Sequence, residues 1–232
     1  STGQQKTIVL ILLIAQCNDL VLNKKLIPIL LFDEICSHLD NFNRKILMEK
    51  NNCMPIIKYV SAKNKKRKRR IKIKKDQWLN NYLDVTKLND VDLIVELIGG
   101  AEGPAKKLVF SALKNKKSVV TANKALIAEH GNGLFEKAQQ KGVTIAFEAS
   151  VAGGIPVIKA LREGLAANQI SWLAGIINGT GNFILTEMRD KGRDFADVLN
   201  EAQALGFAEA DPTFDVEGID AAHKLCILAS IA

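Results

Sequence analysis

The chemically richest stretch of the sequence is GFAEADPTFDVEGIDAAHKL, residues 206–225. Asp220 and Lys224 lie four residues apart in a predicted helix, so their side chains share one helix face. A lysine in a crowded apolar setting becomes a tunable proton donor, whereas the plainer alternative is a helical salt bridge of small energetic value. Glu209, Asp211, Asp215 and Asp220 surround this lysine, and Glu209 and Asp211 on the preceding loop carry the negative charge that a substrate ammonium group requires. The stretch therefore predicts proton transfer beside a cationic substrate group.

Two further motifs combine a strand with a polar turn. VELIGG (residues 95–100) ends in Gly99 and Gly100, and VVTANKAL (residues 119–126) contains Thr121, Asn123 and Lys124. Ligands of open parallel sheets lie outside the carboxyl ends of the strands, and glycine lets a backbone approach a bound group closely. A lysine there can hold a carboxylate or a phosphate. Ordinary strand-to-helix turns with a solvated lysine are the alternative.

Two glycine-containing turns follow. In FEASVAGGIP (residues 147–156), Glu148 and exposed carbonyls suit a hard monovalent cation, because such ions prefer oxygen ligands. The alternative is a tight turn that needs Gly153 and Gly154 for positive φ. In NGTGNFIL (residues 178–185), Gly179 lets a ligand pack against the backbone and Thr180 offers a hydroxyl, although many turns look similar.

The elements that position these residues alternate from residue 91 onward. Strands are predicted over 91–98, 118–122 and 143–150, and helices over 104–116 and 123–142, which is the rhythm of an α/β parallel sheet. Beyond residue 150 we expect a helix opened by Pro156, a strand over 169–178, helices over 181–192 and 194–206, and an apolar helix from 218 to the chain end. That last helix lacks a cap, which predicts that the natural domain continues.

The first ninety residues are less regular. An apolar run at residues 7–22 resembles a strand, residues 33–52 favour a helix, residues 56–73 favour two strands joined by a basic turn, and a short helix precedes residue 91. We expect three segments: an aberrant segment 1–55, a nucleotide-binding domain 56–148 and a partial catalytic domain 149–232.

Charge is concentrated locally. The 232 residues carry a net charge of +7, and ten of the fifteen residues 61–75 are Lys or Arg. Such a run can hold nucleic acid, but it lacks a binding motif, so a solvated loop or a contact with cofactor phosphates is favoured. The four cysteines show neither metal-ligand nor disulfide spacing, which favours a cytoplasmic protein. The apolar runs are too short to cross a membrane.

Taken together, the five motifs in this order resemble homoserine dehydrogenase, clearly so over residues 91–232. That resemblance implies reversible NAD(P)H-dependent reduction of L-aspartate 4-semialdehyde to L-homoserine, in the biosynthesis of threonine, methionine and isoleucine. It also implies a Rossmann-like nucleotide-binding domain, then an α+β substrate and dimerisation domain, and a homodimer. An attached kinase or regulatory domain is compatible with it.

The resemblance assigns roles residue by residue. It implies that Lys224 is the catalytic lysine with Asp220 beside it, and that Lys124 acts near cofactor and substrate. The remaining assignments are substrate binding by Glu209, Asp215 and Thr180, cofactor binding by Gly99, Gly100, Thr121, Asn123, Lys124 and Gly179, and sodium binding by Glu148, Val151, Gly153 and Ile155.

The sequence also departs from the family pattern. The family begins with a G-x-G-x-x-G type loop that holds the cofactor pyrophosphate, and this chain has none after its first apolar run. The chain ends before the segments that complete the family's substrate domain, so we expect a fragment. An inactive truncated homologue is the main alternative, and a basic nucleic-acid-binding module is a less favoured one. Arg67, Lys68, Arg69 and Arg70 incline the expected cofactor toward NADP rather than NAD.

Overall fold

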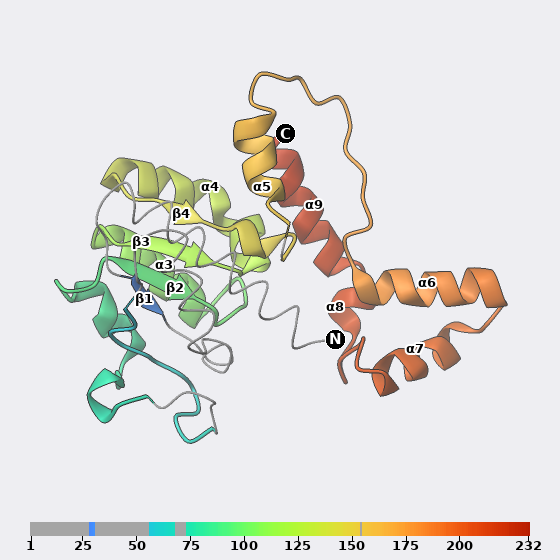
Figure 1. Cartoon of the computed structure of the whole chain (residues 1–232), viewed down its shortest axis with the longest axis horizontal. Coiled ribbons are helices and arrows are strands. Elements are labelled where there is room, and N and C mark those ends of the chain that lie inside the picture. Colours follow the sequence, from blue (N-terminus) through green and yellow to red (C-terminus); the bar gives the residue numbers. More distant parts are fainter. Residues whose placement is uncertain (1–27, 31–55, 68–72, 154) are drawn as a thin grey trace. The chain divides into compact units, whose positions relative to one another are not determined.

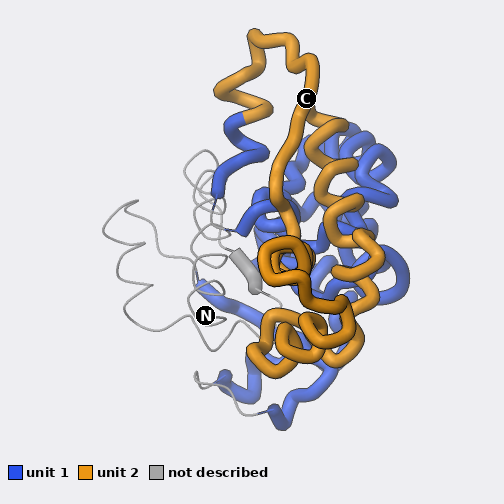
Figure 2. The backbone as a smooth tube through the Cα atoms, turned by 90° about the vertical axis from the view of Figure 1, so that its right-hand side faces the viewer, with its two compact units in different colours: residues 1–160 blue, residues 161–232 orange. Residues whose placement is uncertain are grey.

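The computed structural model describes residues 28–30, 56–67, 73–153 and 155–232. The chain divides into two compact units, residues 1–160 and residues 161–232 (Figures 1 and 2). The strand predicted over 7–22 and the helix predicted over 33–52 lie outside the described residues. Each unit is considered by itself.

Among the described residues, a four-stranded parallel sheet organises the first unit. Its strands β1 (Pro28–Leu30), β2 (Leu93–Glu96), β3 (Ser118–Thr121) and β4 (Ile145–Ala146) pair in that order (Figure 1). Helix α3 (Pro104–Lys114) connects β2 to β3, and α4 (Lys124–Lys141) connects β3 to β4. The predicted α/β parallel sheet is confirmed. Every residue of β2 and β3 is buried, as expected for a sheet covered by crossover helices.

Local sequence explains where the two crossover helices begin and end. Helix α3 starts at Pro104, whose missing N–H costs nothing in a first helical turn. The helix buries one face, formed by Ala105, Leu108, Val109, Ala112 and Leu113. The Asn123 side chain caps α4, accepting a hydrogen bond from the Leu126 N–H, and Gly142 ends that helix in the left-handed region with φ 63°. The helix predicted over residues 123–142 is therefore confirmed.

The segment before β2 differs from the prediction. Of the two strands expected over 56–73, the described part contains only a single parallel bridge between Val60 and Trp78. The Val60 N–H donates to Gln77 O at 2.7 Å, and the Leu79 N–H donates to Val60 O at 3.0 Å. Because 3-10 turns occupy Lys75–Gln77 and Tyr82–Lys87, the chain curls away after one bridge. A sheet ladder, by contrast, needs an extended partner over several residues.

After β4 the chain forms short helical pieces rather than the longer strand predicted over 143–150. A 3-10 turn (Glu148–Ser150) follows the two residues of β4, and α5 (Val157–Lys159) continues into a π-helical turn (Ala160–Gly164). The helix predicted to open at Pro156 is present, because Pro156 occupies the N-cap position of α5.

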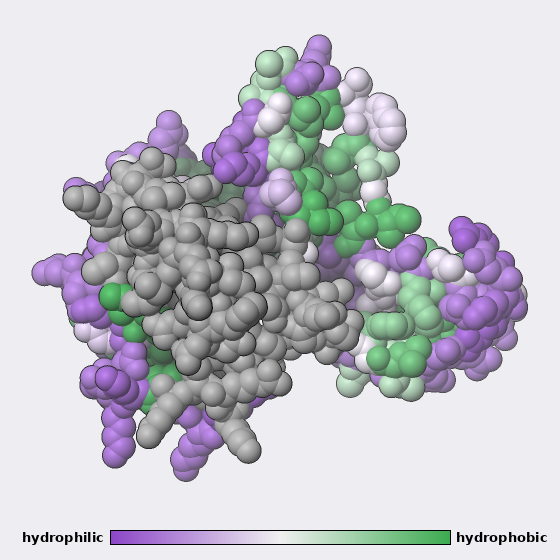
Figure 3. All heavy atoms as spheres, viewed as in Figure 1, coloured by the Kyte–Doolittle hydropathy of each residue, from purple (hydrophilic) through white to green (hydrophobic). Residues whose placement is uncertain are grey.

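The second unit is helical. It contains α6 (Gly179–Lys191), α7 (Phe195–Ala204), α8 (Thr213–Val216) and α9 (Ile219–Ile231). Its small core is formed by Ile184, Val198, Ala202 and Ala208. Large apolar side chains remain exposed elsewhere in the unit, and hydrophobic (green) surface lies beside hydrophilic (purple) surface over α6 and α7 (Figure 3).

The strand predicted over 169–178 is wrong for the described structure. The segment runs without strand hydrogen bonds to any described residue, and both Trp172 and Ile176 are 80% exposed. A β-like residue pattern produces a strand only when a neighbouring strand supplies the hydrogen bonds. Among the described residues, no helix combines the length and apolarity needed to cross a membrane.

The packing of α3 generates a test of the first unit's core. Leu108 is fully buried, whereas Lys107 on the same helix is exposed. We expect Leu108→Ala to lower the free energy of unfolding by about 2–5 kcal/mol, because it removes buried methyl groups and leaves a cavity. Lys107→Ala should change it by less than about 0.5 kcal/mol. Urea unfolding followed by circular dichroism measures both, and equal effects would contradict this core.

Candidate active site

The glycine turn after β2 is organised by a buried carboxylate. Glu96 is fully buried at the end of the strand, where its Oε1 accepts hydrogen bonds from the Ile98 N–H at 2.6 Å and the Gly99 N–H at 3.0 Å. Its Oε2 accepts from the Thr121 hydroxyl at 2.6 Å. Three donors therefore compensate the desolvation of one carboxylate. This arrangement joins the ends of β2 and β3.

The turn itself requires glycine. Gly99 has φ 84° and Gly100 has φ 81°, and residues that carry a Cβ rarely adopt this backbone conformation. A Cβ placed on Gly99 would meet no heavy atom within 4 Å, so the space beside this backbone is open. The turn is thus shaped for close approach of a bound group at the carboxyl edge of the sheet.

Asn123 connects the two predicted cofactor motifs. Its Nδ2 donates to Gly100 O at 2.8 Å, and its own N–H donates to the Thr121 hydroxyl oxygen at 3.0 Å. The same side chain caps α4, which begins at Lys124. The structure therefore brings together the predicted residues Gly99, Gly100, Thr121, Asn123 and Lys124 along one edge of the sheet.

Glu102 lies just beyond the turn and joins α3 to α4. Its Oε1 is 2.8 Å from Lys106 Nζ and 2.8 Å from His130 Nε2. The hydrogen bond from Lys106, with a smaller contribution from His130, holds the pKa of this exposed carboxyl below its usual value. Glu102, just before α3, and Lys106, in the first turn of α3, thus place opposite charges next to the glycine turn.

Glu148 forms hydrogen bonds to the backbone next to the turn that was predicted to bind sodium. Its side chain is 2% exposed, and its two oxygens accept hydrogen bonds from the Ile158 N–H at 2.7 Å and the Lys159 N–H at 3.1 Å. The carboxylate therefore sits at the start of α5, where unpaired N–H groups favour negative charge. Val151, Gly153 and Ile155 lie in the intervening turn, in which the Ile155 carbonyl accepts from the Val157 N–H at 2.8 Å.

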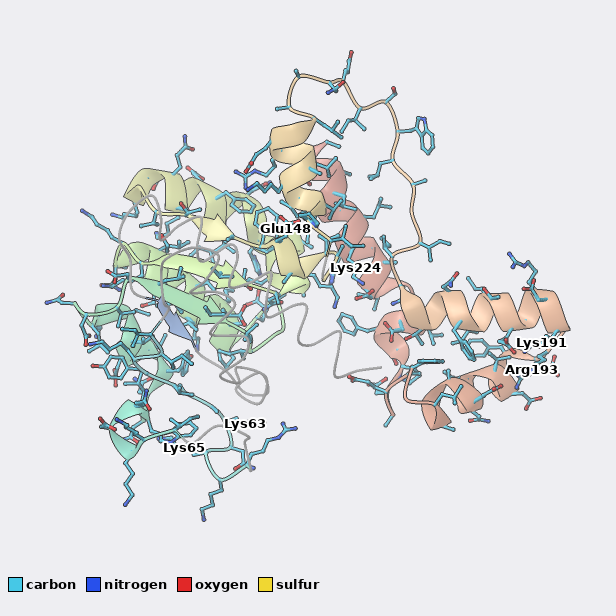
Figure 4. The ribbon with its side chains drawn as sticks, in the orientation of Figure 1. Lys63, Lys65, Glu148, Lys191, Arg193 and Lys224 are labelled. Atoms are coloured by element: carbon cyan, nitrogen blue, oxygen red, sulfur yellow. The ribbon has the colours of Figure 1, made fainter. Side chains whose placement is uncertain are left out.

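The second unit holds the predicted catalytic pair. Lys224 Nζ lies 2.6 Å from Asp220 Oδ2, and the two side chains are 17% and 8% exposed. Figure 4 labels Lys224 on α9. Lys224 Nζ also donates to Ile177 O at 2.7 Å. A charged pair withdrawn from water to this extent differs from the solvated salt bridge of the plainer alternative.

Asn178 gathers the acidic residues around that pair. Its Nδ2 donates to Asp215 Oδ1 at 2.7 Å and to Asp220 Oδ2 at 2.9 Å. Its Oδ1 accepts from the Gly181 N–H at 2.6 Å, which caps α6. Asp215, Asp220 and Lys224 therefore form one cluster, made from α8 and α9 at the start of α6.

The second unit also contains three other residues that were predicted to bind substrate, namely Thr180, Glu209 and Asp211. Thr180 is buried, and its hydroxyl donates to Phe207 O at 2.7 Å. Glu209 is exposed on the loop before α8. On the same loop, the Thr213 hydroxyl and then the Thr213 N–H hold the pKa of Asp211 below its usual value. Within the described part of the chain, the Glu209 side chain makes no hydrogen bond to the cluster.

The sequence did not lead us to predict the roles of two residues in these arrangements, Glu96 and Asn178. A signal for each was present. Glu96 is an acidic residue inside an apolar strand, which is unfavourable unless its carboxylate is hydrogen-bonded. Asn178 precedes the first residue of a helix, where asparagine is a preferred cap. Neither signal identifies the partners that the fold supplies.

One lysine of the basic run, Lys65, contacts other residues of the same unit. Lys65 Nζ donates to Asn80 Oδ1 at 2.9 Å and lies 5.9 Å from the centre of the Trp78 ring, whereas Lys63 points away (Figure 4). Residues 68–72 lie outside the described residues. Residues 63–67 form an exposed loop, and Lys75 begins a 3-10 turn, an arrangement that is compatible with the solvated-loop interpretation.

Comparison with known proteins gives the family. Residues 34–148 match the family model described as homoserine dehydrogenase, NAD binding domain, and residues 156–232 match the model of homoserine dehydrogenase. The chain belongs to the homoserine dehydrogenase family. Homoserine dehydrogenase from Pseudomonas aeruginosa is 73% identical over 152 residues, which are 66% of this chain and 35% of that protein.

Solved structures of homoserine dehydrogenases are also similar to this chain. A homoserine dehydrogenase from Thiobacillus denitrificans superimposes with a TM-score of 0.75 at 48% identity, covering 88% of this chain and 48% of that one. A hyperthermophilic archaeal homoserine dehydrogenase in complex with NADPH gives a TM-score of 0.61 at 33% identity, covering 65% of this chain and 46% of that one. This homoserine dehydrogenase family chain therefore spans about a third to a half of the relatives it matches.

The buried hydroxyl of Thr121 provides a test of the glycine-turn arrangement. Thr121→Val keeps the shape of the side chain but removes a donor to Glu96 and an acceptor for the Asn123 N–H. We expect a loss of about 1–3 kcal/mol of unfolding free energy, because buried polar groups lose partners. The matched control is Thr144→Val, at an exposed threonine beside β4. Chemical denaturation compares them, and equal stability of the two variants would contradict the arrangement.

Proposed function

We propose that this chain carries the catalytic apparatus of homoserine dehydrogenase, the reversible NAD(P)H-dependent interconversion of L-aspartate 4-semialdehyde and L-homoserine. The observation that carries this proposal is the largely buried Lys224–Asp220 pair, 2.6 Å apart, with Asp215 joined to it through Asn178. A lysine held this way is a proton donor next to acidic groups that suit the ammonium of an amino-acid substrate.

In this proposal each side chain has one task. Lys224 donates a proton to the substrate aldehyde oxygen during reduction, and takes it back from the alcohol during oxidation. Asp220 keeps the Lys224 ammonium charged and aligned. Glu209 and Asp215 bind the substrate ammonium group, and Thr180 lines the same end of α6. Lys124, at the start of α4, orients the substrate next to the cofactor.

The cofactor is assigned to the carboxyl edge of the sheet. When bound, the nicotinamide supplies or accepts the hydride. The open space beside Gly99 and the positive φ of Gly99 and Gly100 fit close approach of a flat ring to backbone. Thr121, Asn123, Lys124 and Gly179 complete the proposed contacts. The NADPH complex of the archaeal relative and the basic run both favour NADP over NAD.

Three finer assignments belong to the same proposal. Sodium is assigned to the turn after Glu148, where the carbonyls of Val151, Gly153 and Ile155 supply the oxygen donors that a hard monovalent cation prefers. The carboxylate of Glu148 already accepts two N–H groups, so it acts mainly by shaping that turn. We also expect a homodimer and a cytoplasmic location.

Replacement of Lys224 tests the proposed chemistry. We expect Lys224→Ala to lower kcat for homoserine oxidation by about 10²- to 10⁴-fold with a much smaller change in KM, because proton transfer is lost while most binding contacts remain. The control is Lys191→Ala, at a lysine of α6 that is 62% exposed. It should leave kcat unchanged. An unaltered kcat in Lys224→Ala would refute the assignment.

Cofactor binding separates an active chain from an inactive homologue. Titration of the chain with NADPH and, separately, NADH, followed by nucleotide fluorescence, should show saturable binding with tighter affinity for NADPH. The preference follows from the cationic residues available to a 2′-phosphate. Tighter binding of NADH would overturn the NADP assignment. Absence of binding by both nucleotides would support the inactive homologue instead.

A further inference from the structure

The Asn178 side chain forms hydrogen bonds to three helices. The amide oxygen accepts from the Gly181 N–H at 2.6 Å in the first turn of α6. The amide nitrogen donates to Asp215 Oδ1 at 2.7 Å on α8 and to Asp220 Oδ2 at 2.9 Å on α9. One side chain therefore connects the starts of three helices.

The chemistry of the partners permits only this orientation of the amide. A backbone N–H can only donate, and a carboxylate can only accept. Consequently Oδ1 must face Gly181, and both hydrogens of Nδ2 must face Asp215 and Asp220. Of the residues that cap helices, asparagine combines one acceptor with two donors on a short side chain, whereas aspartate and serine cannot supply both donors.

The arrangement solves an electrostatic problem. Two carboxylates that meet in a partly desolvated place repel each other. Lys224 Nζ lies 2.6 Å from Asp220 Oδ2 and offsets that charge, whereas Asp215 forms no ion pair with any of the described residues. The Asn178 amide, which is neutral, lets Asp215 approach the Asp220–Lys224 pair without a second cation.

We propose that Asn178 is a positioning residue that holds Asp215 and the Asp220–Lys224 pair in the relative geometry that turnover requires. Its role in turnover rests on the proposed function, whereas its effect on the cluster is independent of it. Asn178 acts through Asp215 and Asp220 and does not itself exchange protons. A shift of these groups by a fraction of an ångström would disturb both proton donation and recognition of the substrate ammonium.

The variants Asn178→Ser and Asn178→Asp separate this role from helix capping. Both residues are good caps, so both preserve the hydrogen bond to Gly181. Serine removes the donors, and aspartate in addition places a third carboxylate against Asp215 and Asp220. The matched controls are Asn81→Ser and Asn81→Asp. Asn81 caps a 3-10 turn through the Leu83 N–H and donates to Asp84 Oδ1 at 3.3 Å at an exposed position.

Thermal unfolding of the chain reports on the cluster whether or not it turns over substrate. We expect Asn178→Asp to melt at least about 4 °C below Asn178→Ser, and the two Asn81 variants to differ by less than about 2 °C. Asn178→Asp combined with Asp220→Asn exchanges donor and acceptor and should recover at least half of that loss. Equal melting of the two Asn178 variants, or no recovery in the double variant, would overturn the proposal.

Kinetics report on positioning. In an active chain, Asn178→Ser should lower kcat/KM for homoserine by about 10- to 100-fold, while Asn81→Ser leaves it unchanged. Unchanged kcat/KM in Asn178→Ser would overturn the positioning role. A wild-type chain that binds no nucleotide and oxidises no homoserine would refute the proposed function. In that case the melting comparison would still decide whether Asn178 holds the cluster.

Discussion

The need to hydrogen-bond buried carboxylates shapes both units of this protein. Glu96, Glu148 and Asp220 are 0%, 2% and 6% exposed, and a carboxylate withdrawn from water is tolerated only when donors replace its hydration. Glu96 is satisfied by two backbone N–H groups and a hydroxyl, Glu148 by the first N–H groups of α5, and Asp220 by Lys224 and Asn178. Each carboxylate thereby fixes a turn or a helix start.

In the first unit this requirement determines the shape of the sheet's carboxyl edge. Glu96 ties the glycine turn to Thr121, and Asn123 ties the same turn to the start of α4. The buried residues that pack the sheet are therefore hydrogen-bonded to the residues whose backbone would face a ligand. A parallel sheet brings its strand ends to one edge, and the hydrogen bonds among them turn that edge into a rigid platform.

In the second unit the same requirement assembles a reactive group. Lys224 can be charged and still largely removed from water because Asp220 and the Ile177 carbonyl accept its hydrogens. Because the chain belongs to the homoserine dehydrogenase family, we interpret this pair as the proton donor of the proposed reaction. The proposed reaction needs a proton donor at a defined place, and preorganised partners spare the cost of arranging it during turnover.

The sequence by itself determined the alternation of strands and helices from residue 91, the start of α3 at Pro104 and the end of α4 before Gly142, and the motif that contains Asp220 and Lys224. These features depend on local periodicity, capping and an i, i+4 spacing, all of which are local in the chain. Only the tertiary structure decided that residues 169–178 form no strand, that Glu96 meets Thr121, and that Asn178 joins Asp215 to Asp220. Hydrogen bonds between residues 25 to 42 positions apart depend on which elements the fold brings together, and no local pattern encodes that choice.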